Sequence, residues 1–361
     1  MDCLRLMILM VLLLQGCSTS RYYLQTLHGQ LEVMVAQEHI NDILSDNDSS
    51  PILRERLEFI KSLRKFAIEK LYLPDNNSYT SYADIGREFV VWNVFASPRY
   101  SLQPRQWCYP VAGCFSYRGF FSRDAATNFA TGLEDQDMDV YVAGVRAYST
   151  LGWLADPVLN TIINQEPTYI ARVLFHELAH QKLFLPGDTD FNEAFAETIA
   201  REGVLRWLKL TSDDVHYKRY IDEQAREDQF VKLALDYRSR LQALYQGQCG
   251  LPCKQNEKNQ LLISMLDDYQ TMRKQWTAGT NYDTWFALGV NNAKLAAIST
   301  YRRLMPGFQK LLLNVNYQLG DFYRVTNVLT KCDKQNRDRI LSNPADLAST
   351  SYIETTCIPS G

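Results

Sequence analysis

The chain has 361 residues, enough for one large domain or two, and 46% of them are hydrophobic, which supports a substantial core. Its formal net charge is only −3. Because so small a charge gives no general attraction to a polyanion, the composition argues against a nucleic-acid-binding protein.

The first residues have the pattern of an export signal. Residues 6–14 form an apolar run that suits the core of a signal peptide and is too short to span a bilayer. Residues 14–17, LQGC, resemble the lipobox of bacterial lipoproteins, in which the signal is removed and the cysteine is acylated. We therefore predict a lipoprotein signal peptide at residues 1–16 and a lipid anchor on Cys17. Ser18 favours sorting to the outer membrane of a Gram-negative cell, facing the periplasm, whereas the simpler alternative is a secreted protein with a spare cysteine.

Residues 17–80 are predicted to form a helical N-terminal region. A stripe of apolar residues at helical spacing begins at Leu24 and predicts a first helix. After a polar break, Ser50 is placed to cap a second helix that has Pro51 at its first position. The stripe of the first helix consists of Leu24, Leu27, Leu31, Met34, Val35 and Ile40.

The next segment, residues 81–211, is predicted to contain a small sheet followed by helices. Residues 89–96 are β-branched and aromatic, as in a strand, and residues 139–150 predict one or two further strands. Between them, Ser122 is placed to cap a helix over residues 122–136.

Residues 176–180 have the sequence HELAH, an HExxH motif, within an apolar segment that predicts a helix. Positions four apart lie on one face of a helix, so His176 and His180 can direct two imidazole nitrogens at one metal ion. Glu177 lies beside them, where its carboxylate can reach a water on that ion. This arrangement is typical of a zinc peptidase, with Glu177 as the general base.

A second helix is predicted to begin near Asp190 and carries the sequence NEAFAE at residues 192–197. Catalytic zinc usually takes three protein ligands and leaves one position open, so Glu193 is the predicted third ligand. Glu197 follows one helical turn later and is predicted to accept the outward N–H of a ligand histidine. In the alternative interpretation, Asp190 and Glu193 form a capping box and Glu193 is structural.

These motifs resemble those of known peptidases. HELAHQ followed by NEAFAE resembles the gluzincin zinc peptidases, whose third ligand is the glutamate of an NE motif on the next helix. Residues 96–121, 147–158 and 291–308 are similar to the bacterial putative aminopeptidase family of predicted zinc lipoproteins, and this resemblance covers nearly the whole mature chain. It implies a zinc-dependent peptidase, with the aminopeptidase activity that the family name carries.

The resemblance to gluzincins implies two further features. In that group a tyrosine or histidine after the third ligand stabilises the oxyanion, and Tyr301 is the candidate here, with Tyr148 second. An edge strand also precedes the HExxH helix and pairs with the extended substrate, which points to residues 145–150. An internal strand at the same residues is the alternative.

The rest of the chain is predicted to be helical. Residues 212–280 are predicted to form an antiparallel hairpin of two helices, either packed on the core or projecting to bind a protein partner. Residues 281–361 are predicted to form a C-terminal helical part that packs on the core.

Eight cysteines are present, of which Cys3 lies in the signal and Cys17 is the predicted lipid site. An even number of cysteines in an exported chain predicts disulfides, and near neighbours are favoured among the fifteen possible pairings of the remaining six. A second zinc site at Cys249 and Cys253 is the alternative for that pair. The favoured pairs are Cys108 with Cys114, Cys249 with Cys253, and Cys332 with Cys357.

Together these features predict an α+β, mostly helical fold, with a gluzincin-like core, a small sheet before the HExxH helix, a helical N-terminal region and a C-terminal helical hairpin. The predicted function is a zinc-dependent peptidase, taken first as an aminopeptidase, with Zn²⁺ as cofactor and peptides as substrates. The alternatives are a zinc endopeptidase, a cell-wall amide hydrolase, and a non-catalytic envelope lipoprotein that binds protein partners. An aminopeptidase also needs carboxylates for the free N-terminus, and the sequence does not rank Asp139, Asp156 and Asp188 for that role.

Overall fold

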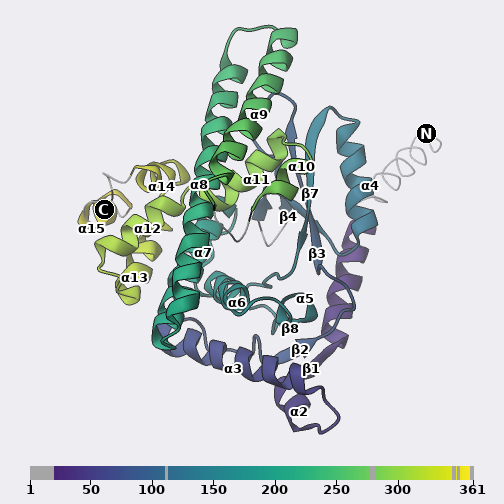
Figure 1. The fold of residues 1–361 in the computed structure, drawn as a ribbon, viewed down its shortest axis with the longest axis vertical. Helices are drawn as coiled ribbons and strands as arrows, with labels where there is room; N and C mark the ends of the chain where they lie inside the picture. The colour runs from purple at the N-terminus through teal and green to yellow at the C-terminus, as the bar shows by residue number, and fades with distance from the viewer. Residues whose placement is uncertain (1–19, 110–112, 277–280, 344–346, 348–349, 358–361) are drawn as a thin grey trace, which may run out of the picture.

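A computed structural model of the chain describes residues 20–109, 113–276, 281–343, 347 and 350–357. Helices dominate these residues, and the strands form small sheets (Figure 1). The predicted fold class, α+β and mostly helical, is therefore confirmed.

A three-stranded antiparallel sheet lies between two helices and precedes the HExxH helix in sequence. Its strand order is β6-β3-β7, so β7 is an edge strand. Val94 and Ala96 pack toward α4, whereas Phe95 between them packs toward α11, as the alternation of side chains along a strand requires. The elements of this layer are β3 (Val91–Pro98), β6 (Arg118–Phe120), β7 (Met138–Val145), α4 (Arg123–Glu134) and α11 (Asn292–Arg302).

Two smaller sheets flank this layer. In the first, β2 pairs with β1 antiparallel and with β8 parallel. In the second, β4 and β5 form a hairpin in which Cys108 and Cys114 are partners in register and are joined by a disulfide. The strands are β1 (Gln37–His39), β2 (Ser81–Ala83), β4 (Trp107–Tyr109), β5 (Gly113–Phe115) and β8 (Val158–Leu159).

The main hydrophobic core is built around two helices that pack along each other, α6 (Pro167–Lys182) and α7 (Thr189–Leu210). α3 crosses them on one side, and the C-terminal helices pack on the other (Figure 1). Pro51 and Pro167 each occupy the first turn of their helix, where the missing N–H costs nothing. The remaining helices of this core are α2 (Ile40–Ser45), α3 (Pro51–Leu71), α5 (Asn160–Ile163), α12 (Met305–Asn314), α13 (Leu319–Leu329), α14 (Lys334–Ser342) and α15 (Thr350–Cys357).

Two long helices, α8 (Asp214–Gln246) and α9 (Leu251–Arg273), lie side by side and extend beyond the body of the molecule (Figure 1). Their inner faces form a second core with α10 (Asp283–Ala287) and α11. Aromatic rings dominate this core, and Phe230 stacks on Tyr282 with ring centroids 3.7 Å apart.

The N-terminal helix covers residues 20–35 and ends sooner than its apolar stripe predicts. The chain leaves the helix because β1 pairs with β2, and the Ile40 N–H then bonds to the Thr80 carbonyl. Ile40 is therefore buried in the main core, whereas Leu24 and Val35 on the N-terminal helix are exposed.

The six cysteines at the predicted disulfide positions form the three near-neighbour pairs. Because Cys249 and Cys253 are bonded to each other, the alternative of a second zinc site there is wrong. Among the helices that the structure describes, none combines the length and the apolar character that a membrane crossing demands.

Candidate active site

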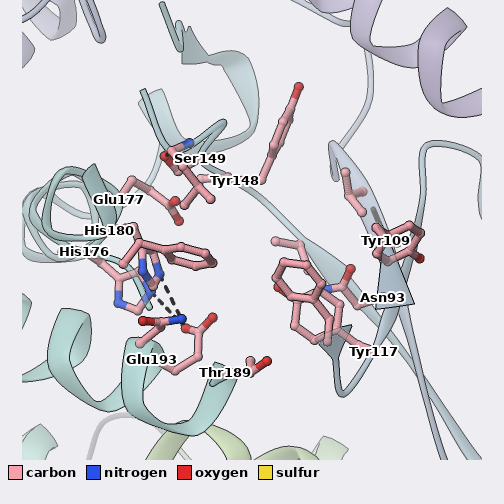
Figure 2. Close-up of a pocket in the computed structure, with 18 of the residues that line it drawn as sticks. Asn93, Tyr109, Tyr117, Tyr148, Ser149, His176, Glu177, His180, Thr189 and Glu193 are labelled. Atoms are coloured by element: carbon pink, nitrogen blue, oxygen red, sulfur yellow. Dashed lines mark hydrogen bonds and ion pairs between the residues drawn. The ribbon is translucent and has the colours of Figure 1, made fainter. Parts of the chain in front are cut away.

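The HExxH motif lies in the last two turns of α6, as the sequence predicts. Buried apolar residues on the opposite face, such as Leu174 and Leu178, fix the helix in the main core. His176 and His180 then point away from that core toward Glu193 on α7 (Figure 2). Two adjacent helices therefore bring the three side chains together.

The three side chains are spaced as a metal site requires. His176 Nε2 lies 3.1 Å from His180 Nε2, and Glu193 Oε2 lies 3.2 Å and 3.7 Å from these two nitrogens. Ligand atoms on a tetrahedral zinc ion, each about 2.0–2.2 Å from the metal, are about 3.4 Å from one another. The observed separations fit that geometry, so His176, His180 and Glu193 could hold a metal ion.

The electrostatics of these residues also favour a cation. Glu193 Oε2 is buried without a hydrogen bond from a described residue. Burial alone would lower the pKa of His176, but the carboxylates of Glu193 and Glu197 outweigh burial and raise this pKa to about 10. Burial alone would raise the pKa of Glu193, yet the charges of His180 and His176 lower it to about 2. The site therefore stabilises positive charge beside an ionised carboxylate. A bound divalent cation would supply that positive charge.

The start of α7 excludes the capping-box interpretation of Glu193. The cap of this helix is Asp188, whose side chain accepts a hydrogen bond from Phe191 N. Asp190 lies in the first turn and pairs with Arg303 at 2.9 Å instead. Glu193 therefore does not cap the helix, and its side chain faces the histidines.

Glu197 lies behind the three candidate ligands, with Oε2 3.5 Å from His176 Nδ1. Its other oxygen, Oε1, contacts Arg172, Arg201 and Arg302. Burial would raise the pKa of Glu197, but Arg172 and Arg302 hold it well below its usual range. Glu197 is thus an ionised carboxylate held next to the outward nitrogen of His176.

The arginines around Glu197 also bind Glu227 of α8. Arg201 Nη2 lies 2.8 Å and Arg172 Nη2 3.0 Å from this carboxylate, and Arg302 of α11 contacts it too. The network ties α6, α7, α8 and α11 together directly behind the site. The sequence carries no local signal for it, because its partners are far apart in the chain, as Glu197 and Arg302 are.

The candidate ligands open onto a cavity of about 400 Å³. Figure 2 shows the histidines and Glu193 on one side and Asn93, Tyr109 and Tyr117 on the other. Glu177 and Glu193 are the acidic residues of the described lining. The lining is otherwise mostly aromatic and amide side chains, which suits a peptide more than a highly charged substrate.

The sequence model of the family described as "Putative aminopeptidase" matches residues 21–341, which contain α6, α7 and all the described residues of the cavity wall. The chain belongs to the putative aminopeptidase family. No curated protein and no solved structure gives a significant match. The family name indicates a peptidase, and the geometry of this member shows where such chemistry could take place.

In this member of the family, the wall opposite the ligands includes the β4–β5 hairpin. Gly113 has φ +83°, and a Cβ there would lie 2.8 Å from Gly187 N in the turn between α6 and α7. Glycine therefore lets the hairpin approach that turn closely. The hairpin carries Tyr109 and Phe115, and the bend between β5 and β6 carries Tyr117; all three line the cavity.

Tyr301 and Tyr117 both present side chains to the cavity. Burial raises the pKa of each hydroxyl far above its usual range, and the negative charge of Glu193 raises it further. Both hydroxyls thus stay protonated and can donate hydrogen bonds. Tyr117 was not predicted from the sequence, because it lies in a bend between β5 and β6 and no periodic pattern marks it. Tyr148, the second candidate, also lines the cavity, but its hydroxyl donates to Gln30 Oε1 at 2.5 Å.

The edge strand predicted at residues 145–150 is wrong beyond its first residue, because β7 ends at Val145. Both carboxylate oxygens of Asp156 accept from the Thr150 N–H, at 3.0 and 3.2 Å. This interaction fixes a turn, and Leu151 follows with φ +59°. Residues 147–149 nevertheless line the cavity.

None of the three aspartates considered for binding a free N-terminus is in the described cavity lining. Asp139 pairs with Lys258 at 2.7 Å, and Asp188 pairs with Arg337 at 2.6 Å. Asp156 accepts hydrogen bonds from Ser149, which lines the cavity, and from Thr150. In this cavity, a carboxylate for an ammonium group would thus have to be Glu177 or Glu193.

A second cavity, of about 290 Å³, lies next to the first. Asn93, Val145 and Tyr301 line both cavities, so the two are neighbours across these side chains. Together the two cavities have room for more than one residue of a peptide substrate.

Proposed function

We propose that this protein is a zinc-dependent aminopeptidase. The observation that carries the proposal is the grouping of His176, His180 and Glu193 around one point, with Glu177 on the same helix and in the same cavity. The family description supports a peptidase, and the three-ligand set supports a catalytic metal more than a structural one, which usually has four protein ligands.

Zinc in such a site supplies Lewis acidity toward the scissile carbonyl and makes water easier to deprotonate. Glu177 takes a proton from the attacking water and delivers it to the nitrogen of the leaving amine. Burial raises the pKa of Glu177, which makes its carboxylate a stronger base. Tyr301 donates a hydrogen bond to the carbonyl oxygen as that oxygen gains negative charge. Glu197 holds the imidazole of His176 in orientation through Nδ1.

A zinc endopeptidase is the second candidate, and two observations favour it. The described lining of the first cavity contains no acidic residue besides Glu177 and Glu193, and Glu227, which lines the adjoining cavity, is already paired with three arginines. The adjoining cavity beyond Tyr301 also provides room for substrate on more than one side. A cell-wall amide hydrolase would use the same chemistry on another peptide.

The proposal includes the location of the protein. We propose that Cys17 carries acyl chains and holds the enzyme at the periplasmic side of the outer membrane. The lipobox-like residues 14–17 and the apolar run before them support this attachment. The paired helices α8 and α9 extend beyond the body and offer a surface to a protein partner (Figure 1).

The decisive experiment is digestion of a mixed peptide library by the zinc-loaded chain beginning at Ser18. Half of the peptides have free N-termini and half are acetylated, and mass spectrometry identifies the products. Stepwise loss of residues from free N-termini alone supports the aminopeptidase. Internal cleavage of both halves supports the endopeptidase, and absence of cleavage with zinc bound contradicts both.

A further inference from the structure

The N-terminal helix, residues 20–35, packs on the body through one face only. Val33 is fully buried in a cluster with Ala83 and Val90. A Cβ at Gly29 would collide with the ring of Phe121, so the helix lies directly against the body at that point. On the same side, the Tyr22 ring lies 3.7 Å below the guanidinium of Arg118.

The opposite face of this helix is apolar and exposed. Successive residues of a helix are about 100° apart, so its exposed apolar side chains cover an arc of about 120°. In Figure 1 the helix is the purple ribbon at the edge of the molecule, below α4. The exposed fractions are 47% for Tyr23, 66% for Leu24, 58% for Leu27, 47% for Leu31, 44% for Met34 and 84% for Val35.

Three polar side chains of the helix bond to the body of the protein instead, whereas Arg21 and His28 are exposed. Gln25 accepts from Phe121 N at 3.1 Å, Gln30 accepts from Tyr148, and Glu32 pairs with Arg87 at 2.6 Å. A surface helix in water normally has the reverse pattern, with its apolar stripe inward and its polar residues outward. The outer arc therefore needs an apolar environment.

We propose that this arc, formed by Tyr23, Leu24, Leu27, Leu31, Met34 and Val35, docks on the surface of the lipid bilayer. The sequence indicates the bilayer because Cys17 lies three positions before Ser20, where the described helix begins. Three residues span at most about 10 Å, so acyl chains on Cys17 would hold the first turn at the membrane. An apolar helical face inserts shallowly at the boundary between headgroups and acyl chains.

The same helix forms part of the cavity wall. Tyr22, Thr26 and Gln30 line the cavity from its inner side. A helix with its side chains is about 10–12 Å across, so docking of the outer arc would place the cavity about that far from the bilayer. Peptides attached to the membrane, or emerging from it, would then lie within reach of the site. This consequence rests on the proposed peptidase function, whereas the docking does not.

The test uses the unacylated chain from Ser18 to Gly361 and vesicles of phosphatidylethanolamine and phosphatidylglycerol. The unsubstituted chain is expected to sediment with the vesicles. The triple variant Leu24→Gln, Leu27→Gln and Leu31→Gln is expected to bind at least ~10-fold more weakly. None of these three residues lines the cavity, so hydrolysis of a free peptide should be unchanged.

A matched control removes three equally exposed apolar residues elsewhere, on α8 and α9. Its substitutions are Val215→Gln, Leu251→Gln and Ile263→Gln, at positions 76%, 65% and 55% exposed. This control is expected to bind vesicles like the unsubstituted chain. The single variant Leu27→Glu provides a second probe of the arc, and equal thermal midpoints show that each variant is folded.

Three results would overturn the docking proposal. They are no vesicle binding by the unsubstituted chain, equal binding by both triple variants, or a dimer in the absence of vesicles that only the arc variant abolishes. The last result would assign the arc to a second copy of the chain. Failure to hydrolyse peptides while vesicle binding persists would count against the proposed function alone.

Discussion

The side-chain amide of Asn192 makes two hydrogen bonds to the backbone of Leu185, one to its carbonyl and one from its N–H, both at 2.8 Å. Asn192 is at the start of α7 and Leu185 follows the end of α6. The amide therefore closes the turn between the two helices and sets the position of Glu193, the next residue, relative to His176. This explains how a short connection brings the third candidate ligand into place.

Replacing Asn192 with alanine should therefore weaken both the fold and the metal site. Two partly buried backbone groups would lose their partner, and an unsatisfied group costs up to about 1–3 kcal/mol when it is fully buried, less where water can enter. We expect a lower free energy of unfolding in urea and weaker zinc binding in a competition titration. Asn327→Ala, on the exposed side of α13, is the control and should change neither. Zinc affinity equal to that of the unsubstituted chain would show that the turn does not set the site.

Glu177→Gln should separate metal binding from turnover. The amide keeps the shape of the side chain but cannot accept a proton, so kcat should fall by about 10²–10⁴-fold. Zinc content, measured by elemental analysis, should stay at the level of the unsubstituted chain because Glu177 is not a candidate ligand. Glu58→Gln on α3, at an exposed glutamate, serves as the control. Turnover that survives in the Glu177 variant would make the assigned base wrong.

The two tyrosines facing the cavity can be distinguished by removing one hydroxyl at a time. If Tyr301 donates to the developing oxyanion, Tyr301→Phe should lower kcat by about 10²–10³-fold and leave KM nearly unchanged. Tyr117→Phe should then act mainly on KM, since that ring forms part of the wall opposite the ligands. The reverse result would assign the oxyanion role to Tyr117.

Glu227 should matter for the active site although it lies on α8. Removing its charge by Glu227→Gln leaves Glu197 as the carboxylate shared by Arg172, Arg201 and Arg302, although Arg201 keeps its pair with Asp228 at 2.7 Å. Breaking such a buried network from one side costs about 3–5 kcal/mol in comparable cases, and less where solvent enters. We expect a lower unfolding free energy and a reduced kcat, because Glu197 also contacts His176.

The control for this network is Asp236→Asn on the same helix. Its partner Arg240 lies 2.7 Å away, but both side chains are about half exposed. An exposed ion pair of this kind contributes about 0–1 kcal/mol, so this variant should be close to the unsubstituted chain. Equal losses in the two variants would mean that the buried position of Glu227 has no special effect.

Local patterns explain which parts of this protein could be predicted from its sequence. His176, Glu177 and His180 are within one helical turn, and Glu193 lies on the next helix, so their spacing alone defines a metal site. The helix caps at Ser122 and the first-turn Pro51 are equally local. Near-neighbour disulfides follow from the spacing of the cysteines.

The features that escaped prediction depend on contacts between distant segments. The stripe on the N-terminal helix predicts a helix, but periodicity does not say which face meets the body. Strand pairing ends that helix before Ile40, and β7 ends at Val145, where its pairing with Val91 of β3 ends. Tyr117 reaches the cavity through pairing of β6 with β3, and Arg302 reaches Glu197 from α11. In each case the partner is far away in the chain, and no local motif marks it.

The disulfide between Cys332 and Cys357 should stabilise the fold more than the disulfide between Cys249 and Cys253 does. It closes a loop with a sequence separation of 25, against 4 for Cys249 and Cys253. Loop-closure entropy predicts about 3.5 kcal/mol for the longer loop and about 2 kcal/mol for the shorter one. Both Cys332 and Cys357 are also buried in the main core, where they join α15 to the helices that pack on α7.

Paired alanine substitutions test this difference. Cys332→Ala with Cys357→Ala should lower the midpoint of thermal unfolding more than Cys249→Ala with Cys253→Ala does. Zinc binding should be retained in both, since neither pair contacts the candidate ligands. If the two double variants lose equal stability, loop length and core position do not govern the effect. Loss of zinc binding in the first variant alone would instead mean that α13–α15 hold α7 in the position that Glu193 needs.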